Sequence, residues 1–162
     1  MRGVLALLFI LAPVPAIALS CMPYNAVSAY QMADGSPDDY VVVLGDLTFG
    51  ESGLPKVDWQ HQEDVKPDNF LTGHITGKSL TKDGFTNGFD QPVKINVQCA
   101  GPWCAGLSQG QHLMFLKRDG ERYLLEVDPC GGFAFGDPDA ATLQKIKACF
   151  RGERCEADLP RY

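Results

Sequence analysis

Alternation of apolar and polar residues predicts β-strands along most of the chain. In residues 92–99 (PVKINVQC), Val93 and Ile95 fall on one face of an extended backbone and polar residues fall on the other. Asp119-Gly120 separates two apolar runs and is a strong hairpin signal. Segments with strand character cover 40–49, 70–80, 92–99, 112–118 and 122–127.

Other segments depart from this pattern. In residues 139–150, Leu143 and Ile146 recur at helical spacing, and acids at the start with bases at the end suit the helix dipole. Residues 22–33 are consistent with a short helix or an ordered arm. Residues 50–68 are polar and lack periodicity, which indicates a long loop.

The order of these elements predicts a mainly β fold. Five short, turn-linked strands close most easily into a small barrel. We therefore expect a five-stranded antiparallel barrel followed by a C-terminal helix. A β-sandwich is the alternative, although it usually has about seven strands.

The first twenty residues have the character of an export signal. Arg2 supplies a positive charge, residues 4–12 form an unbroken apolar run, and prolines and small residues follow. The run ends well short of the roughly 20 apolar residues that a membrane span needs. We therefore expect residues 1–20 to be a signal peptide and 21–162 to be one secreted or periplasmic domain.

Two cleavage positions satisfy the preference for small residues at the cut site. A cut before Leu19 leaves Cys21 as an ordinary half-cystine. A cut before Cys21 exposes its α-amino group or, if the sulfur is acylated, makes the chain a lipid-anchored protein. Ala18 and Leu19 match a lipobox poorly.

The cysteines support the same compartment. An even number of cysteines in an exported domain predicts three disulfides. A zinc site is the alternative, but the spacings lack paired knuckles and no histidine lies close in sequence. All six follow the apolar run: Cys21, Cys99, Cys104, Cys130, Cys149 and Cys155.

Charge and motifs argue against several function classes. A net charge of -6 disfavours binding to nucleic acid or anionic lipid, since both attract a basic surface. No zinc-protease, serine-hydrolase or P-loop motif occurs. We expect neither an enzyme nor a cofactor, and an unrecognised small hydrolase is the alternative.

Trp59 in the long loop is a candidate recognition anchor, and burial of its side chain is the equally weighted alternative.

From Phe70 onward, a strand ending in Cys99 is followed by a loop, a G-x-x-L strand (Gly110, Leu113), a hairpin, Cys130 and a helix that ends at a cysteine. This order resembles the netrin-like domain, the OB-fold found in tissue inhibitors of metalloproteinases, netrins and complement proteins. The resemblance implies an OB-fold barrel in which Cys21 joins the N-terminal arm to the barrel.

The resemblance also implies a function. In the inhibitors of this family, the amino group and carbonyl of an N-terminal cysteine chelate the zinc of a protease. Here that role falls on Cys21, and Met22 and Pro23 would contact the protease. We therefore expect a monomeric, exported binding module with a protein partner. A lipid-anchored envelope protein is the alternative, in which only an acylated Cys21 contacts a membrane.

On this resemblance we expect the disulfides Cys21–Cys99, Cys104–Cys130 and Cys149–Cys155. The first two can be exchanged for Cys21–Cys130 and Cys99–Cys104. The third pair is the most secure, because a helix end followed by Arg-Gly can turn the chain back.

Overall fold

The computed structural model describes residues 19–157, so most of the expected signal peptide lies outside the described residues. Within them the helices are α1 (Ala26–Asp34) and α2 (Ala140–Phe150), and two short 3-10 turns occupy Glu51–Gly53 and Gln62–Asp64. The strands are β1 (Tyr40–Phe49), β2 (Asp68–Thr81), β3 (Gly84–Ala100), β4 (Trp103–Cys104), β5 (Gly110–Asp119), β6 (Arg122–Val127) and β7 (Ala134–Gly136).

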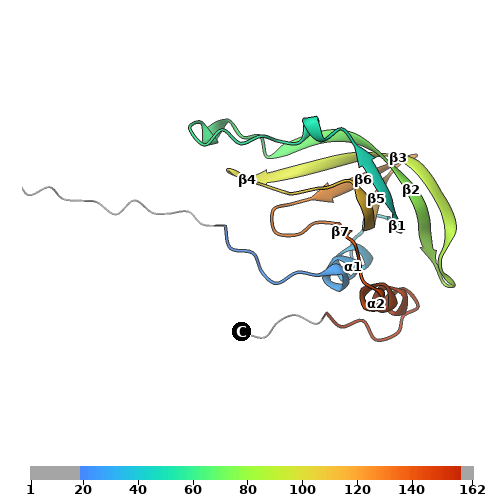
Figure 1. Ribbon diagram of the computed structural model, residues 1–162. Helices are drawn as coiled ribbons and strands as arrows, with labels where there is room; N and C mark the ends of the chain where they lie inside the picture. Colours follow the sequence, from blue (N-terminus) through green and yellow to red (C-terminus); the bar gives the residue numbers. More distant parts are fainter. Residues whose placement is uncertain (1–18, 158–162) are drawn as a thin grey trace, which may run out of the picture.

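The strands form one mixed sheet (Figure 1). β1 pairs antiparallel with β2 and with β5, β2 with β3, and β5 with β6. β3 and β6 run parallel over Lys94–Val97 and Leu124–Val127. The pairing therefore leads from β1 through β2, β3, β6 and β5 back to β1.

The mainly β class and the C-terminal helix are confirmed, but the expectation of a purely antiparallel sheet is wrong. The reason is geometric. Neighbours around a circuit cannot all alternate in direction when the number of strands is odd, so one pair must run parallel. The parallel pair is β3–β6. The very short strands β4 and β7 were not expected from the sequence.

Two hairpins connect neighbouring antiparallel strands of the sheet. Gly120 and Glu121 connect β5 to β6, which confirms the predicted hairpin. The second hairpin joins β2 to β3, and Asn87-Gly88 lies inside β3. The β2–β3 turn is at Lys82 and Asp83, next to Gly84 with a φ of 105°, and a bulge at Ser79/Leu80 adjusts the ladder.

Two hydrophobic clusters meet on β5. Met114 and Leu116 belong to a cluster formed between strands of the sheet. Leu113 and Phe115 face the other way and pack with residues of α1 and α2. Figure 1 shows both helices on the same side of the sheet. Burial on both faces explains why β5 is almost continuously apolar.

The disulfides are Cys21–Cys130, Cys99–Cys104 and Cys149–Cys155. The third pair is confirmed, whereas the expected pairs Cys21–Cys99 and Cys104–Cys130 are wrong. Cys99 and Cys104 lie directly opposite each other in the β3–β4 ladder, with Cα atoms 3.9 Å apart. That proximity leaves Cys21 to pair with Cys130 in the loop after β6, which is the exchanged arrangement considered above.

The two corrected disulfides should differ in their effect on stability. Cys21–Cys130 spans 109 residues and Cys99–Cys104 spans five. By loop-closure entropy, replacing both cysteines with alanine should lower the free energy of unfolding by about 5 kcal/mol for the first pair and by about 2 kcal/mol for the second. Urea unfolding of the two double variants measures this difference. Equal losses would contradict the constraint assigned to Cys21–Cys130.

Candidate functional site

The N-terminal arm, residues 19–25, carries three of the four residues proposed as binding residues. Met22 is 84% exposed, and Cys21 is also exposed. Pro23, the next residue of the arm, is half-buried. The fourth residue, Trp59, is 64% exposed in the β1–β2 loop and does not line the groove beside the arm.

Several contacts hold the arm against the fold. The Cys21–Cys130 bond joins it to the loop after β6. The Tyr24 ring stacks on Phe135 of β7, with centroids 5.9 Å apart. Gly131 packs so closely on the Tyr24 ring that a side chain at position 131 would collide with it. The arm is therefore fixed by a covalent bond and by an aromatic contact.

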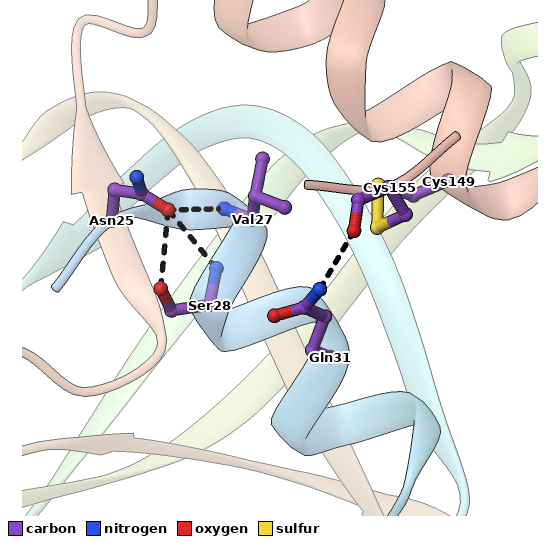
Figure 2. The surroundings of a disulfide bond; sticks show 6 residues. All are labelled: Asn25, Val27, Ser28, Gln31, Cys149 and Cys155. Carbon is purple, nitrogen blue, oxygen red and sulfur yellow. Dashed lines mark hydrogen bonds between the residues drawn. A yellow bond between two sulfur atoms is a disulfide. The ribbon is translucent and has the colours of Figure 1, made fainter. Parts of the chain in front are cut away.

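The arm leads directly into α1, which is fixed in turn. The Asn25 side chain accepts hydrogen bonds from the backbone N–H groups of Val27 and Ser28, both at 3.0 Å, and so caps the helix. Figure 2 shows this cap and the bond from Gln31 Nε2 to the Cys155 carbonyl, at 2.7 Å. Because Cys155 is bonded to Cys149, that contact ties α1 to the end of α2.

A groove of about 380 Å³ runs beside the arm. Its lining is mostly apolar and combines arm residues with Met32 of α1 and Phe133 from the loop before β7. Met32 is 58% exposed. Two exposed methionines, Met22 and Met32, thus border one groove, and flexible, polarisable methionine side chains suit adaptable binding surfaces. We call this surface the arm groove.

Met32 and Phe133 were not predicted as site residues from the sequence. Met32 carried a detectable signal, because it falls outside the buried face of α1 formed by Val27, Ala29 and Tyr30. Phe133 carried none, since it lies in a glycine-rich segment whose position relative to the arm depends on Cys21–Cys130.

Tyr24 is the aromatic residue of the arm that packs on β7. Its hydroxyl group is protonated at neutral pH. Burial, followed by the nearby Asp128 carboxylate and Tyr40, raises its pKa to about 12. The Asp128 carboxylate also accepts a hydrogen bond of 2.7 Å from the Cys130 N–H, which orders the loop that carries the disulfide.

Two histidines form pairs with aspartates in the part of the chain described. His61 bonds to Asp58 at 2.9 Å and His74 to Asp90 at 2.6 Å, and both pairs are exposed. These contacts lower the pKa values of the two aspartates. Residues 19–157 contain no group of three His, Cys, Asp or Glu side chains arranged to hold a metal ion, and all six cysteines are paired.

Comparison with known proteins reveals no relative: no family model matches the chain, and neither a curated protein nor a solved structure is similar to it. Among the helices of residues 19–157, none is long and apolar enough to cross a membrane. The three disulfides indicate an oxidising, extracytoplasmic environment.

The Tyr24 environment predicts a dependence of stability on alkaline pH. Because the folded pKa of Tyr24 is about 12 and the ordinary value is 10.0, the stabilisation is complete below about pH 10 and is lost as pH rises towards 12. Tyr24→Phe should therefore reduce the fall in unfolding free energy between pH 9.5 and 11.5, measured by urea unfolding.

Part of that fall should remain in Tyr24→Phe, since burial also raises the pKa values of Tyr30 and Tyr40. A variant whose pH profile is identical to that of the unmodified protein would show that the Tyr24 hydroxyl is not buried against the arm loop.

Proposed function

We propose that the protein is an exported binding module that contacts a protein partner through the N-terminal arm and the arm groove. The observation that carries this proposal is Met22, which is 84% exposed on an arm fixed by Cys21–Cys130. Holding an apolar anchor in place before binding reduces the ordering cost of association. Such anchors, packed into a partner's pocket, supply most of the binding energy at protein interfaces.

We further propose that the domain is an OB-fold barrel of the netrin-like kind. The strand circuit β1–β2–β3–β6–β5–β1 supports this assignment, because a small barrel requires each strand to pair on both sides. The link from the arm to the sheet through Cys21–Cys130 agrees with the role that the resemblance implies for Cys21.

The specific activity that we propose is inhibition of a zinc protease. After cleavage before Cys21, its α-amino group, which has a pKa near neutrality, and its carbonyl oxygen would occupy the open position of a catalytic zinc ion. Met22 would enter the adjacent specificity pocket, and Pro23 would restrict the backbone that follows. The disulfide would keep the chelating atoms in place.

The lipid-anchored alternative competes for the same sulfur atom. Attachment of a diacylglycerol anchor requires the Cys21 thiol to form a thioether, but that sulfur is bonded to Cys130. The disulfide therefore favours a binding arm over a membrane anchor.

Mass spectrometry of the exported protein and an inhibition assay test this proposal together. A chain that begins at Cys21 should inhibit at least one of a panel of zinc endoproteases, and acetylation of its α-amino group should abolish inhibition, because an amide nitrogen does not chelate zinc. Met22→Ala should weaken inhibition at least tenfold by removing the anchor.

Lys82→Ala, in the β2–β3 turn, is the matched control and should inhibit normally. A mature chain that begins at Leu19 would rule out chelation by the Cys21 amine. Absence of inhibition by a chain that begins at Cys21 would contradict the protease-inhibitor function.

A further inference from the structure

A second groove, of about 300 Å³, lies on the sheet where β2 and β3 meet the β5–β6 hairpin. Most of its lining is apolar and includes Phe70, Leu71, Val93, Tyr123 and Leu124. None of its lining residues belongs to the arm groove. We call it the sheet groove.

The parallel β3–β6 ladder determines where this groove opens. That ladder begins at the pair Lys94–Leu124 and continues toward Val97. Before Lys94, β3 has no ladder to β6, and the sheet groove lies at this end of the parallel pairing, beside Pro92 and Val93. Because proline has no backbone N–H, the strand edge at Pro92 leaves no donor unsatisfied.

Phe70 forms an exposed aromatic surface beside the opening. It is 53% exposed, in contrast to the buried aromatic rings of the core. The Lys94 ammonium group lies over this ring, 3.9 Å from its centroid, in a cation–π contact. An apolar ligand on Phe70 would therefore lie next to a positive charge.

The charges beside the groove are mostly positive, although the chain as a whole has a net charge of -6. Lys94 and Arg122 line it, together with one acid, Asp119. Neither cation forms an ion pair with any residue in the range 19–157. An anionic group of a ligand could pair with both without displacing an acidic side chain.

We propose that the sheet groove binds a small amphipathic carboxylate. The apolar body of the ligand contacts Phe70, Leu71 and Tyr123, and its carboxylate lies between the Lys94 ammonium and the Arg122 guanidinium. The volume is at the lower end of the range for small-molecule sites, which favours a free small molecule over a segment of a protein. This site is independent of the arm and of the proposed protease inhibition.

Octanoate is the probe for this site, with octylammonium as a ligand of equal chain length and opposite charge. In NMR titrations of the mature protein, octanoate should shift the backbone amide signals of Phe70, Val93 and Leu124. Octylammonium should bind at least tenfold more weakly, because its charge is repelled by both cations. Raising the salt concentration should weaken octanoate binding, since the ion pairs are exposed.

Two variants separate the charge contribution from the apolar contribution. Lys94→Gln combined with Arg122→Gln should weaken octanoate binding at least tenfold, and Phe70→Ala should do the same through loss of the apolar surface. Lys82→Gln, which removes an exposed charge outside the groove, should bind octanoate normally. All these side chains are exposed, and far-UV circular dichroism checks that each variant is folded.

Equal binding of octanoate and octylammonium would overturn the proposal, as would undiminished binding to the Lys94/Arg122 double variant. Signal shifts confined to the arm groove would overturn it as well. An acidic peptide that binds the sheet groove more tightly than octanoate would assign the site to a protein partner and would also contradict the proposal.

Discussion

Burial of β5 on both of its faces is the constraint on which the rest of this structure depends. Met114 and Leu116 pack with the other strands, while Leu113 and Phe115 pack against the two helices. The sheet circuit and the helical layer therefore share one strand. The other strands cover one face of β5, so α1 and α2 together cover the second face and lie on the same side of the sheet. This position of α1 brings the N-terminal arm, which precedes it, near β7.

The odd number of strands in the circuit is the second constraint. It requires one parallel pair, and the short ladder between β3 and β6 supplies it. The end of that ladder leaves room for the sheet groove beside Pro92 and Phe70. A feature of topology thus creates a concave surface. Lys94 and Arg122, which form no ion pair within residues 19–157, give that surface its positive charge.

The arm groove has a different origin. It depends on long-range bonds between segments that are far apart in the sequence: Cys21 with Cys130, Tyr24 with Phe135, and Gln31 with the Cys155 carbonyl. These contacts join the arm, α1 and the end of α2. An exposed apolar side chain at Met22 is therefore held in a defined position, which is why the arm is the basis of the proposed function.

The sequence by itself determined the local elements. Period-two alternation at Val93 and Ile95, the Gly120 turn and the helical spacing of Leu143 and Ile146 all reflect backbone geometry over a few residues. It also predicted three disulfides, from an even number of cysteines after an export signal. These features need no information about distant parts of the chain.

Only the tertiary structure decided which distant segments meet. The partner of Cys21, the parallel β3–β6 pair, the short strands β4 and β7, and the contributions of Met32 and Phe133 to the arm groove all follow from which faces can be buried together. Local patterns show which side of a segment is apolar, but burial requires a second surface, and the choice of that surface is a property of the whole fold.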